Sequence, residues 1–511
     1  MISLLASAAE RTVTWLDYVT FGVYIAATLA VGLSVGGKQK DLKMYLLAGH
    51  QMHWAMIAIS VLAALFSGIS FLGAPAESFN HNLVYLWVIL AYFVATPITT
   101  LVFLPFFYRL NFYTAYEYLE HRFDLTLRRL SSAAFVLRVC FWLALALSAP
   151  SLVISEMTGI PLWESIVFTG ACTTLYTAVG GMRAVIYTDV MQFCVLLTGI
   201  VLIFVVAVHQ TPGGLEAAWR IAQEGGRTTM MDWSLSPTAR LTVWGAFFGG
   251  AALNLVQLVT DQISVQRYLT ATSLKESQRA LWFKLFLTVP LISIFYLTGL
   301  VLYSFYQTHP EMAATLLRPD QLLAHFVGRQ IASPVPGLLV AAILAATMSA
   351  ASSGINSLTT ATLIDFLYTM NKEAGSVAGE AGRVRTARRW TVFYGCVATG
   401  LALVVSKLGT LIEASSKIAG FFGGPLLGIF FLGVLSRRAN AWGALIGAIV
   451  GFGVIVGTAF GSGVSFIWYA LIGAVVTYAV GEVASRFFAP PNETQRSFTM
   501  SGRPKLAKVI D

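Results

Sequence analysis

The chain has 511 residues, of which 57% are hydrophobic and 11% charged, and its mean hydropathy is +0.73. A soluble globular protein carries about 25% charged residues, so this composition excludes a soluble enzyme. The net charge of +9 does not indicate a nucleic-acid partner, because in a membrane protein the positions of the positive charges matter more than their sum. We therefore expect an all-α polytopic membrane protein.

Apolar stretches of the length needed to cross a bilayer, about 20 residues, recur along most of the chain. We predict thirteen spans, at approximately 15–36, 53–79, 82–108, 130–157, 161–179, 184–208, 241–265, 281–306, 335–367, 390–406, 411–435, 441–462 and 464–485. With an outside N-terminus, 24 of the 33 Lys and Arg residues fall on the cytoplasmic side, Arg267 and Lys284 among them. This asymmetry predicts an outside N-terminus and a cytoplasmic C-terminus.

Two of the predicted spans contain residues that interrupt a transmembrane helix. The second has Ser-Gly-Ile-Ser at 67–70 and then Pro75, and the seventh has a group of glycines followed by two amides on one helical face, at Gly245, Gly249, Gly250, Asn254 and Gln257. A pair of interrupted spans at corresponding positions of two halves indicates an inverted-repeat transporter with a binding site at the membrane midplane. The alternative is that the glycines only allow helices to pack closely.

The ninth and sixth predicted spans carry oxygen ligands suited to a hard cation such as Na⁺. In the ninth, three hydroxyls and an amide share one helical face, from Ser349, Ser352, Ser353 and Asn356. In the sixth, Asp189 lies about one turn inside the cytoplasmic end, and intramembrane carboxylates usually mark an ion path. The alternatives are that the serines join helices and that Asp189 caps a helix at the interface.

Two cations are assigned to the interior of predicted spans, whereas Lys284, at the start of the eighth span, is counted on the cytoplasmic side. Arg138, in the fourth, suits an anionic substrate, although snorkelling to the interface or an internal ion pair would also explain it. Lys417, in the eleventh, is expected to pair with Glu413 one helical turn earlier, and we assign it no role.

Several segments together resemble the sodium/solute symporter family, and most closely its iodide, monocarboxylate and multivitamin symporter branch. Besides the interrupted second span and the serine-rich ninth, they are Tyr-Leu-Leu-Ala-Gly at 45–49, Phe-Phe-Tyr-Arg-Leu at 106–110, Tyr-Glu-Tyr-Leu-Glu at 116–120, Gly-Gly-Met-Arg at 180–183, Tyr-Thr-Asp-Val-Met-Gln at 187–192, Val-Gln-Arg-Tyr at 265–268 and Gly-Gly-Pro-Leu-Leu-Gly at 423–428. The resemblance implies a leucine-transporter-like core of five plus five helices, with one extra helix before it and two after. It divides the chain into an N-terminal helix and loop at 1–52, repeats at 53–208 and 241–435 separated by an extracellular loop at 209–240, two helices at 436–489 and a cytoplasmic tail at 490–511.

The resemblance also implies inward Na⁺-coupled solute uptake and assigns ligands to the ion. The first sodium site would use the carbonyls of Ala63, Phe66 and Ala346 and the hydroxyl of Ser349. A second hydroxyl position of that site is Ala350 here, which removes one ligand. A second site, nearer the cytoplasm in some members, would use Asp189, Ser352 and Ser353, so we expect one or two ions per cycle.

For the substrate, the resemblance argues against a sugar. Ser70 stands where relatives that bind sugar or iodide carry Gln, and Gln257 stands near the position of an aromatic residue that stacks on a sugar. A small, monocarboxylate-like anion fits better, held by Ser67, Ser70, Asn254, Gln257 and Arg138, with Trp142 as an apolar wall, because the N-terminus of a half-helix attracts anions.

Several alternatives stay open. The solute could instead be sialic acid, an amino acid, a sugar or an inorganic anion, the coupling ion could be H⁺ with Asp189 as its carrier, or the protein could be a sensor with a transporter fold. We find no catalytic constellation and do not expect an enzyme. Short loops and basic inside segments favour a bacterial inner membrane, and the oligomeric state is left open.

Overall fold

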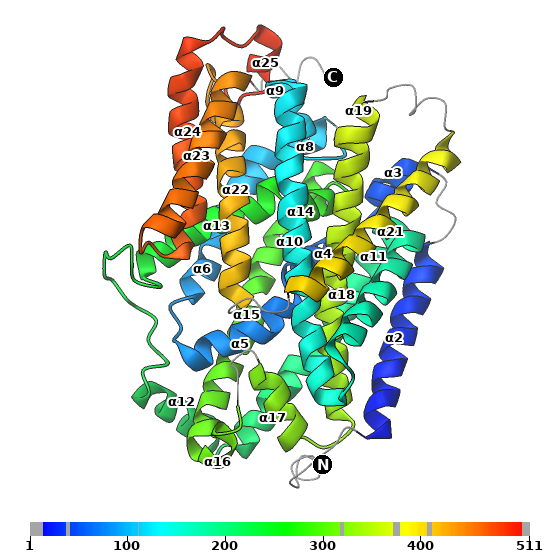
Figure 1. Ribbon diagram of the computed structural model, residues 1–511, viewed down its shortest axis with the longest axis vertical. Coiled ribbons are helices and arrows are strands. Elements are labelled where there is room, and N and C mark those ends of the chain that lie inside the picture. The colour runs from blue at the N-terminus through cyan, green and yellow to red at the C-terminus, as the bar shows by residue number, and fades with distance from the viewer. Residues whose placement is uncertain are drawn as a thin grey trace.

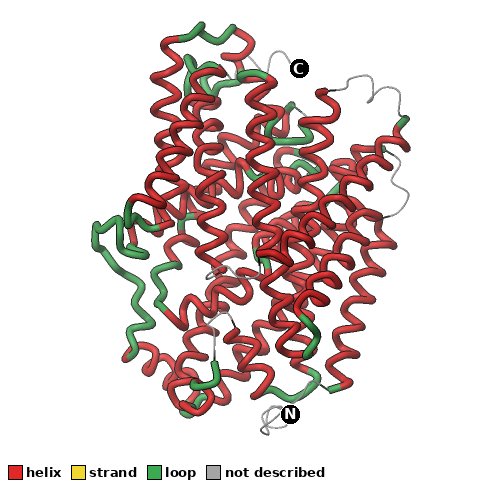
Figure 2. The backbone as a smooth tube through the Cα atoms, viewed as in Figure 1, coloured by secondary structure: helices red, strands yellow, loops and turns green. Residues whose placement is uncertain are grey.

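The computed structural model describes residues 14–36, 41–110, 112–316, 321–370, 379–405 and 411–502, and within these ranges the chain contains helices and loops without a named β-strand (Figure 2). Most of the long helices run roughly along the vertical axis of Figure 1, others are strongly tilted, and together they form one bundle. They are α2 (Trp15–Gly36), α10 (Leu125–Thr158), α11 (Leu162–Gln210), α15 (Leu274–Thr308), α18 (Val335–Ala361), α21 (Glu380–Val405), α22 (Leu411–Leu435), α23 (Ala441–Gly461) and α24 (Tyr469–Ala484).

Shorter helices complete the spans and cover the two ends of the bundle. The third predicted span is built from α6 (Leu86–Leu90), α7 (Tyr92–Ile98), the π-helix η2 (Thr99–Phe103) and α8 (Leu104–Arg109). The short helices α12 (Gly214–Glu224), α16 (Pro310–Ala313) and α17 (Leu322–Gln330) lie at the bottom of Figure 1, whereas α3 (Leu42–Leu47), α9 (Glu117–Arg122), α19 (Tyr368–Met370) and α25 (Glu493–Ser497) lie in its upper part. This is the division that the predicted topology requires, with the latter group on the expected cytoplasmic side.

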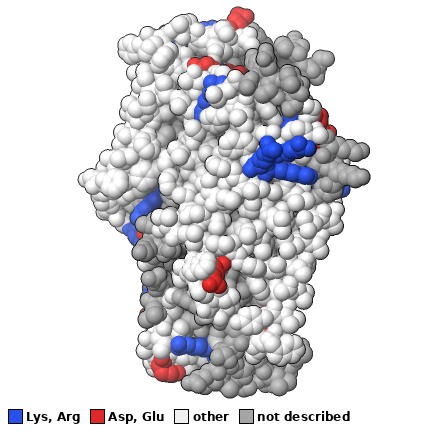
Figure 3. Space-filling view, turned by 45° about the vertical axis from the view of Figure 1, so that its right-hand side comes forward, with Lys and Arg blue, Asp and Glu red and all other residues white. Residues whose placement is uncertain are grey.

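The surface agrees with an integral membrane protein. Within the described residues, nine helical segments are long and apolar enough to cross a membrane, and the bent pair α4 (Trp54–Leu65) and α5 (Gly68–Asn80) makes a tenth candidate. Figure 3 shows that most of one face is uncharged, with the largest group of Lys and Arg in its upper half. The number thirteen itself stays a prediction.

The fifth and sixth predicted spans both lie within α11, as two helical segments separated by a sharp kink at Gly181. Its backbone has φ +58° and ψ −160°, and a Cβ there would lie 2.6 Å from the carbonyl oxygen of Tyr45 on α3. Only glycine tolerates both the left-handed φ and this close approach. The Tyr45 phenol donates to the carbonyl of Ala178 at 3.1 Å, which fixes α3 against the kink.

The predicted interruption of the second span is confirmed. Helix α4 ends at Leu65 and α5 begins at Gly68, and the two helices are bent by 64°. Gly68 lies against Pro150 of α10 and Thr347 of α18, so a side chain has no room there. The last carbonyls of α4 and the first amides of α5 lack helical partners at such a break and can bind other groups.

The predicted interruption of the seventh span also exists, but its expected position at the glycines is wrong. Residues of that span form the π-helix η3 (Gly245–Gly249), α13 (Gly250–Leu255), the π-helix η4 (Val256–Thr260) and, after the break, α14 (Gln262–Tyr268). The break lies at Asp261, whose backbone is extended and whose carboxylate accepts from the Ile263 amide at 3.0 Å to cap α14. The glycines are helical instead and allow close packing, since Gly249 faces Ile467 and Gly250 faces Val88.

Candidate functional site

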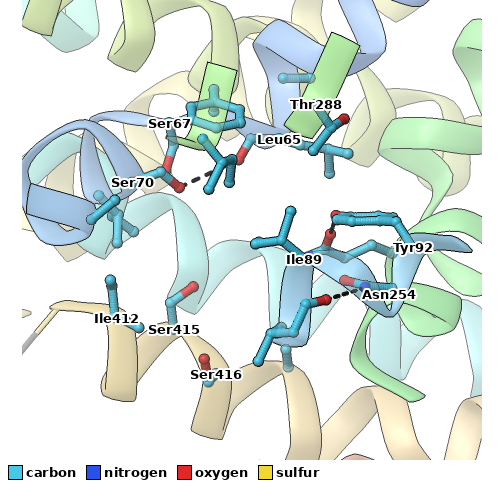
Figure 4. A pocket seen from close by; sticks show the side chains of 18 of the residues that line it. Leu65, Ser67, Ser70, Ile89, Tyr92, Asn254, Thr288, Ile412, Ser415 and Ser416 are labelled. Carbon is cyan, nitrogen blue, oxygen red and sulfur yellow. Dashed lines mark hydrogen bonds between the residues drawn. The ribbon is translucent and has the colours of Figure 1, made fainter. Parts of the chain in front are cut away.

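A cavity of about 160 Å³ lies between the two helix breaks. Its wall is formed by the α4–α5 break, α6 and α7, α10, the segment from α13 through η4 to the start of α14, α15 and α22 (Figure 4). All six side chains predicted for the substrate site line it: Ser67, Ser70, Arg138, Trp142, Asn254 and Gln257. The structure therefore brings together residues that lie far apart in the sequence.

Several polar groups of the cavity are held by local contacts. The Tyr92 phenol donates to the side-chain oxygen Oε1 of Gln257 at 2.6 Å. The side-chain amide of Asn254 donates to the backbone oxygen of Val88 at 2.8 Å. These two bonds connect the third and seventh predicted spans and fix both amides. Figure 4 shows Ser415 and Ser416 of α22 across the cavity from Ser67 and Ser70, and sequence reasoning missed both.

Arg138 forms an internal ion pair, which was one of the three explanations considered for it. Its Nη2 atom lies 2.6 Å from Oδ2 of Asp261, which makes an ion pair, although the two groups are not aligned as in a hydrogen bond. Both side chains are buried, and both line the cavity. The pair joins α10 to the break in the seventh span, and its opposite charges largely cancel.

Asp189 is buried completely, so the alternative that it caps a helix at the interface is wrong. Its Oδ1 atom accepts from Ser349 Oγ at 2.5 Å, and its Oδ2 atom accepts from Ser60 Oγ and from Arg267 Nη2, the latter at 3.0 Å. Arg267 also donates to Ser353 Oγ and, through Nε, to Ser60 Oγ at 2.8 Å. Four elements, α4, α11, α14 and α18, thus meet in one buried polar cluster.

The cytoplasmic side predicted for Arg267 and Lys284 stays a prediction, but neither is a solvated cation at a span end. Both side chains are fully buried, Arg267 in the cluster with Asp189 and Lys284 in the wall of the cavity. Counting cations near span ends treats them as solvated, whereas the short helix α14 places Arg267, and the long helix α15 places Lys284, inside the bundle. Arg267 belongs to the Val-Gln-Arg-Tyr segment at 265–268, one of the segments that carry the family resemblance. Its membership in that segment could have indicated a role inside the protein.

The residues predicted for the first sodium site lie at the end of α4 and on α18. Ala63, Phe66, Ala346 and Ser349 are all buried, and α4 and α18 pack against each other. Phe66 follows the last residue of α4, and its amide donates to the Leu62 oxygen at 2.9 Å. The carbonyls at this helix end are the kind of free oxygen that binds a cation.

The serines predicted for a second sodium site have hydrogen bonds of their own. The hydroxyls of Ser352 and Ser353 both donate to the Ser349 backbone oxygen, and Ala350 is buried without a polar group. Two of the three predicted ligands of that site, Asp189 and Ser353, contact the Arg267 guanidinium. A cation at this position would have to share them with Arg267.

Outside the cavity, Lys417 and Glu413 form the predicted ion pair, with Nζ 4.0 Å from Oε2. Glu413 also binds Arg240 at 2.9 Å, and Arg240 in turn contacts both carboxylate oxygens of Glu77, at 2.6 and 2.7 Å. Sequence reasoning did not single out this three-residue cluster at the end of α5.

A family model described as the sodium:solute symporter family matches residues 45–451. The rabbit (Oryctolagus cuniculus) sodium-dependent multivitamin transporter is 33% identical over 504 residues, which cover 98% of this chain and 76% of the relative. The human sodium-coupled monocarboxylate transporter 1 is 31% identical over 456 residues (88% and 74%), and the human sodium/iodide cotransporter is 30% identical over 454 residues (87% and 70%).

Among solved structures, the outward-open, substrate-bound state of a Na⁺-coupled sialic acid symporter is similar with a TM-score of 0.88 and 28% identity, covering 94% of this chain and 99% of that one. A transporter of the nucleobase-cation-symport-1 family in a closed conformation is similar in fold, with a TM-score of 0.55 and 15% identity over 90% and 98% of the two chains. These likenesses confirm the leucine-transporter-like fold.

Proposed function

The chain belongs to the sodium:solute symporter family, and from this premise we propose that it couples Na⁺ entry to the uptake of a small carboxylate by alternating access. It is an integral membrane transporter and not an enzyme. The observation that carries the proposal is the cavity between two helix breaks, lined by serines, amides and charged groups. Transporters of this architecture bind solutes where discontinuous helices meet at the midplane.

The size of the cavity supports a small solute. Its volume of about 160 Å³ is close to that of an engineered cavity of about 150 Å³ that binds benzene, a ligand of about six heavy atoms. Lactate, pyruvate and propionate are of that size, whereas a sugar acid or a vitamin would require a wider conformation. A relative 31% identical is a sodium-coupled monocarboxylate transporter, which supports the same solute class.

For the ion, we propose one principal Na⁺ site formed by the carbonyls of Ala63, Phe66 and Ala346 with the hydroxyl of Ser349. A second ion at Asp189, Ser352 and Ser353 would require Arg267 to move, because its guanidinium contacts two of these residues. The oxygens of the principal site come from α4 and α18, so the ion would hold the two helices together. Each Na⁺ that enters across 100 mV releases about 2.3 kcal/mol, which drives solute accumulation.

In this mechanism, Na⁺ stabilises the outward-facing state and prepares the α4–α5 break for the solute. The two repeats would be residues 53–208 and 241–435, moving relative to each other around the cavity. We propose a bacterial inner membrane with the N-terminus outside, on the strength of the basic inside segments.

Uptake into proteoliposomes tests the proposal. We expect labelled lactate, pyruvate or propionate to accumulate with an inward Na⁺ gradient and not when K⁺ replaces Na⁺. Iodide, galactose, proline, nicotinate and sialic acid serve as comparison solutes. Accumulation driven by a proton gradient without Na⁺ would contradict the coupling, and Na⁺-dependent stabilisation without transport of any solute would favour a sensor.

A further inference from the structure

Lys284 is a buried cation in the wall of the cavity. It lies on α15, where Thr288 and Ile292 follow at one and two helical turns and also line the cavity. Its side chain is fully buried, and its Nζ atom has no hydrogen-bond partner in the described part of the chain. The face of the Tyr92 ring partly compensates its charge, with the ring centroid 3.4 Å from Nζ.

The charges around the cavity do not balance. Three charged side chains line it, and two of them, Arg138 and Asp261, neutralise each other in the ion pair described above. No carboxylate of the described residues lies within ion-pair distance of Lys284. A buried ammonium without a counter-ion is unfavourable, and an aromatic face offsets only part of that cost.

We infer that Lys284 binds the carboxylate group of the transported solute and is the principal selector of anions in this cavity. The inference rests on the proposed function. It assigns the binding of the solute carboxylate to Lys284 instead of Arg138, because Arg138 is already paired with Asp261. A solute carboxylate near Nζ would supply the missing negative charge. The first turn of α5, where Ser67 and Ser70 line the same cavity, provides further donors for its second oxygen or its substituent.

The inference makes a prediction about selectivity that depends on charge alone. A carboxylate such as lactate should bind, whereas its neutral amide, lactamide, should not, although the two molecules have nearly the same shape. The preference arises because only the carboxylate can compensate the Lys284 ammonium. In the wild-type protein, excess unlabelled lactate should therefore abolish labelled lactate uptake, and lactamide at the same concentration should leave most of it.

The direct test compares Lys284→Met, Lys284→Arg and Lys275→Met in the Na⁺-driven uptake of labelled lactate. Lys275 is the matched control, because it lies on the first turn of the same helix and is exposed. We expect Lys284→Met to raise the KM for lactate about tenfold or more, as for the loss of a charge-assisted bond, and Lys284→Arg to recover part of the affinity. Lys275→Met should behave like wild type, and Na⁺ should still raise the Tm of Lys284→Met, which shows an intact fold and ion site.

The outcomes separate this inference from the proposed function. If wild-type protein takes up no carboxylate with Na⁺, the proposed function is wrong. If wild type transports lactate but Lys284→Met keeps the same KM and the same rejection of lactamide, the role of Lys284 is wrong. Should Lys284→Met fail to fold, the competition in wild type decides, because equal inhibition by lactamide and lactate would overturn the inference.

Discussion

Arg138 and Asp261 are paired across the bundle, with Nη2 of the arginine 2.6 Å from Oδ2 of the aspartate. The aspartate also caps α14 by accepting from the Ile263 amide. A single carboxylate therefore stabilises the start of the helix after the break and forms the ion pair with Arg138 of α10. The pair therefore fixes the cavity wall on one side and leaves the charge of Lys284 unbalanced on the other.

The two members of this pair should depend on each other for stability. Removing one partner of a buried ion pair leaves an uncompensated charge and typically costs about 3–5 kcal/mol. We expect Arg138→Met or Asp261→Asn alone to lower the Tm of the purified protein strongly, and the double variant to lower it by much less than the sum. Thermal unfolding in detergent measures the three changes as a double-mutant cycle. Additive losses would show that the two side chains do not interact.

Ser349 offers the cleanest test of the sodium site, because its substitution removes no charge. Its hydroxyl donates to Asp189 at 2.5 Å and is also the proposed Na⁺ ligand. We expect Ser349→Ala to raise the Na⁺ concentration for half-maximal uptake about tenfold, since a hydroxyl ligand is lost, and to destabilise the protein by about 1–3 kcal/mol.

The matched control for that experiment is Ser357→Ala on the same helix. Ser357 is equally buried, and its hydroxyl has no hydrogen-bond partner in the described chain. Its loss should change neither the Na⁺ dependence nor the Tm appreciably. An unchanged Na⁺ dependence in Ser349→Ala would remove Ser349 from the ion site, whatever the effect on stability.

Much of this site could be predicted from local sequence patterns. Ser67, Gly68 and Ser70 in an apolar run predicted a helix break, and the break is present. It lies beside a cavity because free backbone oxygens and amides are tolerated at membrane depth only in such a place. The serines of the ninth span and Asp189 were each expected to bind a cation, and the family resemblance grouped Asp189 with Ser352 and Ser353. The structure brings Ser349 and Ser353 into one cluster with Asp189 and Arg267.

The parts that could not be predicted involve partners distant in sequence. Arg267 and Lys284 lie near span ends, where a sequence alone gives no reason to bury them. Which cation pairs with Asp189, and which is left without a carboxylate, depends on how α14 and α15 pack. Asp261 carried an overlooked signal, because an aspartate inside a predicted span marks a break as well as a charge.

Glu117 is expected to make stability depend on pH. It lies on α9, outside the spans, and accepts from the amides of Tyr113 and Thr114 at 2.7 and 2.9 Å. Burial raises its pKa to about 7, although nearby Arg128 opposes the shift and Asp365 adds to it. The folded protein then binds more protons than the unfolded chain between about pH 4.5 and pH 7, so this contribution to stability falls as the pH rises through that window.

The variant Glu117→Gln should reduce this pH dependence, because an amide accepts the same hydrogen bonds without ionising. We expect the loss of Tm between pH 5 and pH 8 to be smaller in Glu117→Gln than in wild type. Glu493→Gln, at an exposed position of α25, is the control and should leave the pH profile unchanged. An identical profile in wild type and Glu117→Gln would contradict the prediction.

Arg240 should hold the cavity closed at the end where α5 and α22 meet. It contacts both oxygens of Glu77 on α5 and one oxygen of Glu413 on α22, while Ala74 and Ile412, close to these acids in sequence, line the cavity. In Arg240→Ala the two carboxylates lose their shared cation and repel each other.

The measurement uses a cysteine introduced by Ser70→Cys in a chain whose four natural cysteines are replaced by alanine. In Arg240→Ala this cysteine should react about tenfold faster or more with a membrane-impermeant thiol reagent. That factor corresponds to about 1.4 kcal/mol less stabilisation of the closed cavity. Lys417→Met is the matched control, because Lys417 is exposed and lies 4.0 Å from the same Glu413, a surface pair expected to contribute little. If both variants leave the reaction rate of Ser70→Cys unchanged, the cluster does not control access to the cavity.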